Sequence, residues 1–277
     1  MEPISIIIPN YNGKELLKKN LPGIVKAVER HNENDEIIVV DNGSSDGSVE
    51  FLRENYPQIR IIELKENKGF GQACNIGVKK SKNKIVILLN NDVMVEENFI
   101  EPLLKHFSDP LVFSVSAVSL GRDNRKKEIP EKVKEVLYCC AGYTAYDKEK
   151  FLFLGGFHPI YSPFYCEDRD IGYRAKKIGW KNLIEPKSIV YHEGERTSKK
   201  LNRRYVEYIK FRNRCIFYLT CYDNPFLIFF SILKLIINAF FSFKWYTIFS
   251  FFFLIKNYDK IKQKKIFEKN VKNFICK

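Results

Sequence analysis

Residues 4–13 read ISIIIPNYNG, a short apolar run that stops at a cluster of turn-forming residues. Residues 36–47 (EIIVVDNGSSDG) and 85–92 (IVILLNND) repeat this pattern. Short runs rich in Ile and Val are typical of strands that are buried on both faces. These three stretches therefore predict neighbouring core strands, each followed at once by polar residues.

The stretches between these runs have the apolar spacing of helices. We predict helices over residues 14–31, 49–55 and 72–80 and a further strand over residues 60–64. Such an alternation predicts an α/β fold with a mostly parallel sheet flanked by helices. Residues 111–146 have a looser pattern, in which residues 122–127 predict a solvated loop. Farther along the chain, we expect a polar helix over residues 166–179 and a strand over residues 188–191 that ends at His192.

The charge of the chain is concentrated at one end. The 277 residues carry a net charge of +13, but residues 1–195 hold 28 Lys and Arg against 29 Asp and Glu, and residues 196–277 hold 18 against 4. A basic segment that is also rich in Phe, Ile and Leu suits an anionic membrane surface better than a nucleic acid. We therefore expect no nucleic-acid partner, and the seven cysteines, none in a CxxC pair, predict a reduced cytosolic protein without a zinc site.

The C-terminal segment predicts helices that lie on a membrane. Its uncharged runs are shorter than the ~18–20 residues that a membrane-spanning helix needs. Asn224-Pro225 predicts a helix start, and the polar residues that follow recur at helical spacing on an otherwise apolar helix: Ser231, Lys234, Asn238 and Ser242. Trp245 and Tyr246 fit the headgroup level. The alternatives are that these helices pack on the rest of the chain or form a dimer contact.

Four residues in this pattern suit transfer from a nucleotide sugar. A leaving diphosphate needs a divalent cation such as Mg²⁺ or Mn²⁺, which prefers oxygen ligands, and Asp92 at a strand end suits this purpose. His192 at another strand end is a further candidate ligand. The attacking hydroxyl needs a general base, which the adjacent carboxylates Glu167 and Asp168 offer.

Six motifs, in order, resemble the family 2 glycosyltransferases, which adopt the GT-A fold. They are residues 6–12 (IIIPNYN), 39–48 (VVDNGSSDGS), 67–77 (NKGFGQACNIG), 88–93 (LLNNDV), 155–157 with 167–174 (GGF and EDRDIGYR), and His192 with Gly194 and Ser198. The Asn-containing form of the fourth motif is similar to that of rhamnosyltransferase-like members. The resemblance covers roughly residues 3–215, which we assign to a GT-A catalytic domain, and we assign residues 216–277 to a basic, hydrophobic, helical tail that associates with the membrane.

The resemblance implies a role for each motif residue. Tyr11 would stack on a pyrimidine whose ring N–H Asp41 accepts, Gly69 and Gly71 would let the backbone approach the donor, and Asp92 with His192 would bind the metal or the phosphates. Asp168 would be the general base, and Glu167 would hold it or contact the acceptor. The remaining residues expected at the nucleotide sugar are Pro9, Asn12, Lys68, Asn75, Asn90 and Asn91.

Two positions depart from the family pattern. Asn90 stands at the first position of the DxD segment, so that Asp92 is the one carboxylate there. His158-Pro159 follows the Gly-Gly-Phe segment where many relatives have Asp-Glu, which affects acceptor recognition and leaves the base intact.

We therefore expect an inverting glycosyltransferase that moves a sugar from a UDP or dTDP donor, with dTDP-rhamnose favoured by resemblance. The acceptor would be a hydroxyl of a saccharide or of a lipid-linked saccharide, in cell-envelope polysaccharide synthesis at the cytoplasmic face of the membrane. The alternative is a non-catalytic, membrane-docked module that binds a nucleotide sugar. A dinucleotide-dependent oxidoreductase is disfavoured because Cys74 replaces the third glycine of GxGxxG.

Overall fold

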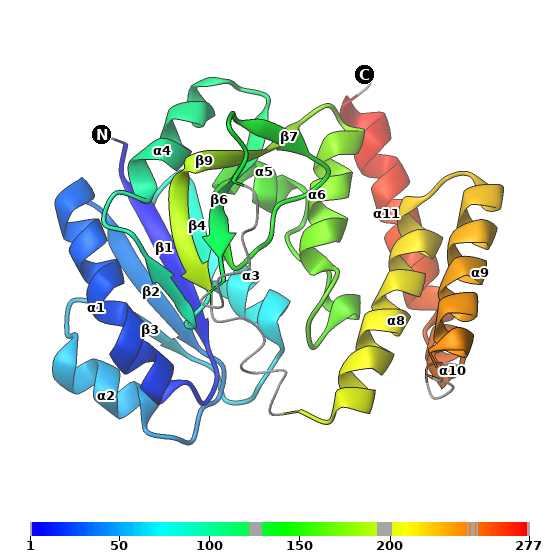
Figure 1. The fold of residues 1–277 in the computed structure, drawn as a ribbon, viewed down its shortest axis with the longest axis horizontal. Coiled ribbons are helices and arrows are strands. Elements are labelled where there is room, and N and C mark those ends of the chain that lie inside the picture. Colours follow the sequence, from blue (N-terminus) through cyan, green and yellow to red (C-terminus); the bar gives the residue numbers. More distant parts are fainter. Residues whose placement is uncertain are drawn as a thin grey trace.

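The computed structural model describes residues 2–121, 129–192, 201–242, 244, 247 and 249–275, with side chains up to residue 268 (Figure 1). The predicted loop at residues 122–127, the motif residues Gly194 and Ser198, and the proposed headgroup residues Trp245 and Tyr246 lie outside these ranges.

The strands of the described residues form one sheet of nine strands in the order β3-β2-β1-β4-β8-β6-β9-β5, with β7 paired to β9. The strands are β1 (Ile4–Asn10), β2 (Glu36–Asp41), β3 (Arg60–Glu63), β4 (Ile85–Leu89), β5 (Val93–Val95), β6 (Val112–Leu120), β7 (Lys134–Val136), β8 (Tyr143–Asp147) and β9 (Lys181–His192). Strands β3, β2, β1 and β4 are parallel to one another, and β6 is parallel to β9. The other pairings are antiparallel.

The helices that flank the sheet are mostly those that the sequence predicts. They are α1 (Lys14–His31), α2 (Ser48–Asn55), α3 (Phe70–Lys80), α4 (Ile100–Leu104), α5 (Lys148–Phe153) and α6 (Glu167–Lys177). The prediction of residues 14–31 is confirmed at both ends, and the other predicted helices differ from the structure by one or two residues at an end.

Side chains of β1 alternate between two cores, as the pleat of a strand requires. Ile4, Ile6 and Ile8 pack with α1, α2 and α4 on one face of the sheet. Ile7 packs with α3, α5 and α6 on the other face. Figure 1 shows these two helical layers on either side of the strands. The α/β prediction with a mostly parallel N-terminal sheet is therefore confirmed.

The loosely patterned region at residues 111–146 contains strands that the sequence analysis did not predict. Strand β6 is nine residues long and almost wholly buried, and β8 joins it to β4. Serines at positions 114, 116 and 119 interrupt its apolar run. These serines make β6 look less hydrophobic in the sequence than a buried strand usually does. The Ser114 hydroxyl is nevertheless accommodated inside the protein, where it donates a hydrogen bond to Asn182 Oδ1 over 2.8 Å.

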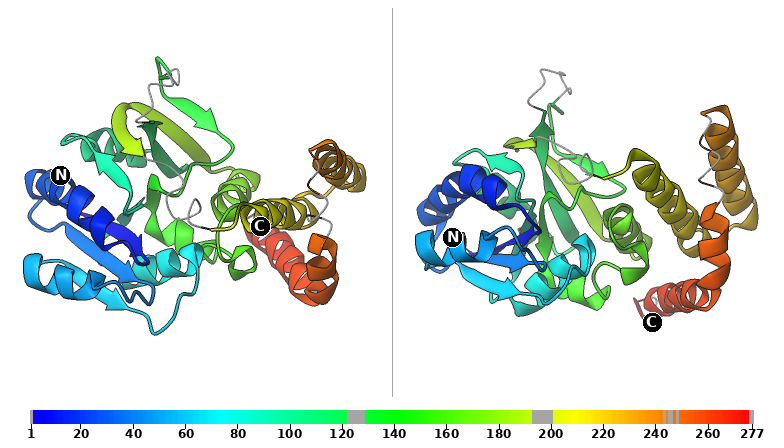
Figure 2. Two further views of the ribbon diagram at one scale, coloured as in Figure 1. Left: turned by 60° about the horizontal axis from the view of Figure 1, so that its bottom comes forward. Right: turned by 90° about the horizontal axis from the view of Figure 1, so that it is seen from below.

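The C-terminal helices form a separate layer at the end of the molecule farthest from α1 and α2 (Figures 1 and 2). They are α8 (Arg203–Cys221), α9 (Pro225–Phe241), α10 (Ser250–Lys256) and α11 (Tyr258–Ile275), and they pack around a third core with Ile160 and Tyr161. The predicted cap of α9 is confirmed, because Asn224 Oδ1 accepts hydrogen bonds from the N–H groups of Phe226 and Leu227. Residue 215 lies inside α8, so this helix runs across the boundary that we assigned between catalytic domain and tail.

No helix among the described ranges is both long enough and apolar enough to cross a membrane.

Candidate active site

The polar residues that follow β1, β2 and β4 meet at one edge of the sheet. Asn10 Nδ2 donates to Asp41 Oδ1 over 3.1 Å, and Asn10 Oδ1 accepts from Asn91 Nδ2 over 2.8 Å. This contact follows from the register, since Asn10 pairs with Asp41 at the ends of parallel strands. Ligands of open α/β sheets bind outside the carboxyl ends of the strands. The polar residues predicted after these strands therefore converge at one ligand-binding edge, and Asn10 is a connecting residue that the sequence analysis did not single out.

Asp41 is buried beneath the segments that follow β1 and β2, which lie side by side at Asn12 and Ser44. Its Oδ2 accepts a hydrogen bond from the N–H of Ser44 over 2.9 Å. Asn12 and Ser44 tie the two segments together, because the Ser44 hydroxyl accepts from the N–H of Asn12 and Asn12 Oδ1 accepts from the N–H of Ser45. Tyr11 lies beside this joint with its side chain 42% exposed. An exposed ring next to a buried carboxylate can stack on a planar ligand while the carboxylate accepts an N–H from its edge.

The loop that precedes α3 is fixed by side-chain amides. Asn42 Oδ1 accepts from the N–H of Lys68 over 2.9 Å, and Asn42 Nδ2 donates to Asn67 Oδ1 over 3.0 Å. Asn67 Oδ1 also accepts from the N–H of Gly69. The Lys68 side chain is exposed at the tip of this loop. The loop thus carries an exposed cation on a backbone that hydrogen bonds hold in place.

Gly69, Gly71 and Asn75 have contacts within the protein itself. Gly69 has φ +85°, and a Cβ there would lie 2.6 Å from Ser162 Oγ. A Cβ on Gly71 would lie 3.1 Å from the Cβ of Phe157. Both polar atoms of the Asn75 amide bond the backbone of Phe157, over 2.8 and 2.9 Å. Gly71 and Asn75 therefore hold α3 against Phe157 of the Gly-Gly-Phe segment, whereas Gly69 lies against Ser162 and Pro163. The contact of these three residues with a donor stays a prediction.

Asn90, Asp92 and His192 form the candidate metal centre. Asn90 and Asp92 lie in one tight turn after β4, in which the N–H of Val93 bonds the carbonyl of Asn90 over 3.2 Å. Pairing of β5 with β9 places Val93 opposite His192, and His192 Nε2 lies 3.0 Å from Asp92 Oδ1. The Oδ1 atom of Asn90 is buried and has no hydrogen-bond partner among the described residues. A buried carboxylate, an unpaired amide oxygen and an imidazole fit a divalent cation, although Asn90 brings no charge.

Residues 140–143 connect this centre to the predicted base, and the sequence analysis missed them. The carbonyl of Gly142 accepts from the N–H of Asn90 over 2.9 Å, and the Tyr143 ring packs edge-to-face on His192. The backbone of Ala141 bonds the Asp168 carboxylate. A Cβ on Gly142 would lie 2.7 Å from Asn90 Nδ2, so a larger residue at this position would displace the Asn90 side chain. That glycine, within an otherwise unpatterned stretch, is the one signal from which the segment could have been found.

Glu167 and Asp168 begin α6. Glu167 is buried, and its Oε2 has no partner among the described residues. Burial, and then repulsion by Asp168, raises the pKa of Glu167 well above its usual value. Burial also raises the pKa of the half-buried Asp168, against the hydrogen bonds from the N–H groups of Arg169 and Ala141. A carboxylate whose pKa is raised is a stronger base near neutral pH.

Asn213 holds the loop that leads into α6. Its Nδ2 donates to the carbonyls of Tyr161, Phe164 and Tyr165 over 2.7, 2.9 and 2.8 Å. Tyr165 and Cys166 adopt positive φ values of 73° in this loop, a conformation that non-glycine residues adopt only where their surroundings hold them. A residue of the C-terminal layer thereby fixes the direction in which Glu167 and Asp168 leave the loop.

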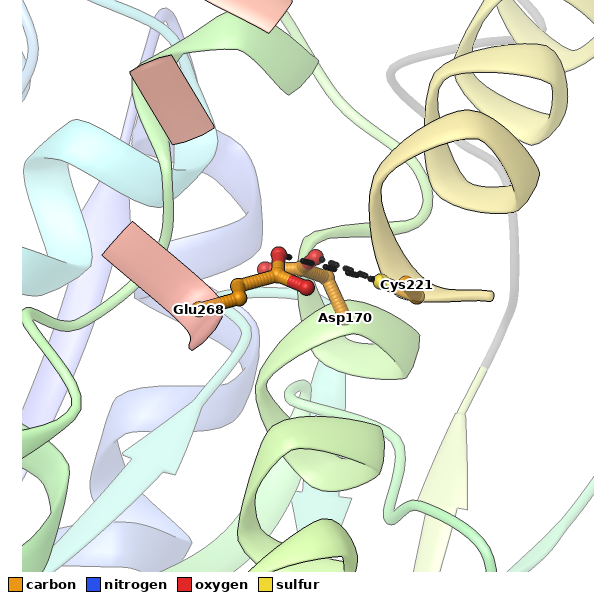
Figure 3. Close-up of side chains that lie close together, drawn as sticks. All are labelled: Asp170, Cys221 and Glu268. Atoms are coloured by element: carbon orange, nitrogen blue, oxygen red, sulfur yellow. Dashed lines mark hydrogen bonds between the residues drawn. The ribbon is translucent and has the colours of Figure 1, made fainter. Parts of the chain in front are cut away.

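Asp170, Cys221 and Glu268 form a second acidic cluster, buried between α6, α8 and α11 (Figure 3). Their ligand atoms lie within 4.8 Å of one another, as metal ligands would. However, the ammonium group of Lys264 donates to Asp170 Oδ1 over 2.6 Å and to Glu268. Burial alone would raise the pKa of Asp170, but the charges of Arg174 and Lys264 hold it well below its usual value. The lysine thus supplies the cation that the acidic groups require, and we assign this cluster a structural role.

The sequence matches one family model. Residues 5–166 match the family described as Glycosyl transferase family 2. Glycosyltransferase GlyG of Streptococcus pneumoniae serotype 4 is 31% identical over 113 residues, which cover 39% of this chain and 36% of that protein. The aligned stretch thus spans about a third of this relative's length.

Solved structures share the fold. GalNAc-T7, solved with UDP, GalNAc and Mn²⁺, matches with a TM-score of 0.65 and 18% identity, over 81% of this chain and 49% of that chain. The mannosyltransferase PcManGT from Pyrobaculum calidifontis, solved with GDP-Man and Mn²⁺, matches with a TM-score of 0.64 and 14% identity, over 97% of this chain and 84% of that chain. The predicted GT-A fold is confirmed by these likenesses.

Proposed function

The chain belongs to glycosyl transferase family 2, and on this basis we propose that it transfers a sugar from a nucleotide-diphosphate donor to an acceptor hydroxyl. The observation that carries the proposal is the joining of three groups of residues through residues 140–143. The N–H of Asn90 bonds Gly142, the ring of His192 packs on Tyr143, and Asp168 accepts from Ala141. A metal centre and a base held by one segment are what transfer from a diphosphate leaving group requires.

The donor base would lie between the Tyr11 ring and Asp41. Pro9, Asn12 and Asn91 would shape this pocket, because they lie at the ends of β1 and β4 beside the Asn10–Asp41 contact. Lys68 would reach the donor from its exposed loop. Asp41 accepts an N–H equally from uracil and thymine, so UDP and dTDP sugars both fit. We keep dTDP-rhamnose as a candidate donor, on the Asn90-Asn91-Asp92 segment.

Asp92, Asn90 and His192 would hold Mg²⁺ or Mn²⁺ through the oxygen and nitrogen atoms described above. When bound, such a cation stabilises the negative charge of the leaving diphosphate. The 3.0 Å separation of His192 Nε2 and Asp92 Oδ1 suits two atoms that bind one cation.

Asp168 would take the proton of the acceptor hydroxyl. Its hydrogen bonds from the N–H groups of Arg169 and Ala141 fix the carboxylate. Glu167 lines a small pocket together with Gln72 and Phe164, where its unpaired Oε2 can accept a hydrogen bond from the acceptor. Direct attack by the activated hydroxyl inverts the anomeric centre.

The outer surface of α9 and α10 would hold the enzyme on a membrane. Large apolar side chains lie more than half exposed on these two helices and at the N-cap of α10: Phe226, Leu227, Phe229, Phe230, Phe240, Phe241, Phe249, Phe252 and Ile255. An apolar surface of this kind, on a strongly basic segment, suits the interface of an anionic bilayer. A lipid-linked saccharide at the cytoplasmic face would then be the acceptor. The catalytic domain and the membrane-associating tail would differ in function, although α8 belongs to both.

Turnover of a nucleotide-sugar panel tests the proposed activity. We expect the purified chain with Mn²⁺ or Mg²⁺ to transfer or hydrolyse one donor, and EDTA or Asp92→Ala to remove at least 99% of that activity. Asp109→Ala, which changes an exposed aspartate away from the site, is the matched control and should keep activity. Binding of a nucleotide sugar without turnover by any acceptor tested would instead favour the non-catalytic module.

Vesicle flotation tests the membrane surface. The double variant Phe229→Ser/Phe241→Ser removes two rings that are 60% and 75% exposed and should weaken binding to anionic vesicles about tenfold or more. Leu111→Ser/Leu152→Ser, which changes two exposed leucines elsewhere, should bind like the unchanged chain. Equal binding by both double variants would contradict the assignment of this surface.

A further inference from the structure

A cavity of about 760 Å³ lies between the C-terminal helices and the segment that precedes α6. One wall is formed by residues 158–162, and the opposite walls by Arg212 of α8 and by residues of α10 and α11. His158, Pro159 and Ser162 also line the small pocket that contains Glu167. The cavity is therefore a separate space that shares a wall with the acceptor side of the candidate active site.

The walls of the cavity are positively charged. Among the described residues that line it are four cations, Arg174, Arg212, Lys260 and Lys264, and no carboxylate. Arg174 and Lys264 are paired with Asp170 behind the wall, and Lys260 is exposed at the rim. The cavity thus presents more positive than negative charge to whatever enters it.

Arg212 is the least compensated of these cations. It is only 6% exposed, and its guanidinium donates to neutral acceptors, the Ser162 carbonyl and Asn213 Oδ1. No ion pair to Arg212 is found within the described ranges of the chain. A buried cation without a counter-ion costs free energy, and an anion in the cavity would recover part of that cost.

His158, on the wall shared with the small pocket, adds no positive charge to the cavity. Burial, together with the charges of Lys264 and Arg174, lowers the pKa of His158 to about 4. The imidazole therefore stays neutral at physiological pH.

The remaining walls of the cavity are apolar. Phe253 lies with its ring 4.4 Å from the Arg212 guanidinium, and Phe267, Ile160 and Leu154 extend the apolar lining. The helix that carries Phe253 also carries Phe252 and Ile255 on the exposed membrane-facing surface. A small inorganic anion would leave most of this lining without a partner.

We propose that the cavity binds a phosphate or diphosphate monoester that carries an apolar group, with the phosphate beside Arg212 and Lys260 and the apolar group against Phe253 and Phe267. Such a ligand is supplied either by a phosphorylated membrane lipid or by a soluble phosphate ester. Binding here does not require the donor site, so the proposal stands or fails independently of the proposed transfer reaction.

Calorimetric titration of the full chain tests the proposal with three probes: decyl phosphate below its micelle concentration, inorganic phosphate, and decanol. We expect decyl phosphate to bind most tightly. Lys260→Gln should weaken its binding about fivefold, as for a partly screened ion pair. Lys262→Gln changes an exposed lysine two residues away that does not line the cavity, and it should have no effect.

Further variants separate the two halves of the ligand. Phe267→Ala should weaken decyl phosphate about tenfold and leave inorganic phosphate unchanged. Arg212→Gln, assayed only if its unfolding transition matches that of the unchanged chain, should abolish binding of both phosphates. Equal binding of inorganic phosphate and decyl phosphate would overturn the proposal, because the apolar lining would then contribute nothing to binding. Equal binding of decanol and decyl phosphate, equal losses in Lys260→Gln and Lys262→Gln, or no binding of either phosphate would overturn the proposal.

Discussion

Replacing Asp168 by asparagine is expected to lower kcat for sugar transfer by about 10²–10⁴-fold, the usual contribution of a general base. The amide cannot take the proton of the acceptor hydroxyl, yet it keeps the size of the side chain and one oxygen that accepts from the N–H groups of Arg169 and Ala141. Donor binding should therefore be unchanged, and calorimetry with the donor nucleotide would show this. A fall in donor affinity of the same size as the fall in kcat would contradict the role of base.

The pH dependence of the same variant supplies a second readout. The pKa values of Glu167 and Asp168 are both raised in the folded protein. Activity should rise with pH as the pair loses a proton, along a limb that lies above the ordinary aspartate pKa of 3.8, and Asp168→Asn should lack this limb.

The stability of Asp168→Asn distinguishes loss of a base from loss of the fold. A carboxyl whose pKa is raised on folding binds more protons in the folded state, so its ionisation lowers the free energy of unfolding as pH rises. Removing it should leave this free energy at pH 8 unchanged or higher, as urea unfolding would measure. Asp109→Asn, at an exposed carboxylate whose pKa is lowered by the hydrogen bond from Lys181, is the matched control and should not become more stable.

The second large effect is expected at Lys264, far from the donor site. Lys264→Met should lower the free energy of unfolding by about 3–5 kcal/mol, because Asp170 and Glu268 would lose a buried cation. Lys264 is only 2% exposed and also donates to the Thr220 hydroxyl over 3.2 Å. Urea unfolding at pH 7.5 would measure the change, and the exposed Lys262→Met should stay within about 0.5 kcal/mol of the unchanged chain.

A double variant tests the electrostatic cause of this loss. Lys264→Met/Glu268→Leu removes one charge of each sign and leaves Asp170 paired with Arg174, whose Nε bonds Asp170 Oδ2 over 3.0 Å. We expect the double variant to recover more than half of the stability lost in Lys264→Met. If the double variant were no more stable than the single one, packing of the lysine stem rather than its charge would explain the loss.

The positions of the strand-end residues at the candidate donor site could be predicted from the sequence because they depend on a local pattern, and their contacts with a donor stay predictions. Each of β1, β2 and β4 is a short apolar run followed directly by its polar residues, and parallel pairing of the strands brings those residues together. Asp41 and Asp92 could thus be placed at one edge from their position after a strand.

Other features were less predictable because they depend on contacts between distant parts of the chain. His192 reaches Asp92 through the pairing of β5 with β9, across 100 positions of sequence. The structure of residues 140–143 is determined by partners in β4, α6 and β9, and their own sequence has little pattern. In the sequence, Lys264 is one of many basic residues in the C-terminal segment. Its burial becomes evident only from the packing of α11 against α6.

The Lys264–Asp170 contact also determines the order in which parts of the protein can fold during synthesis. Asp170 and its cation are 94 positions apart, and ribosomes add about 5–20 residues per second, so roughly 5–20 s pass between their syntheses. During that interval the helix that begins with Glu167 and Asp168 has an acidic residue facing a core that is not yet closed. A nascent chain could therefore build its N-terminal parallel sheet early, and the carboxylates of Glu167 and Asp168 would reach their final positions only once α11 has been made.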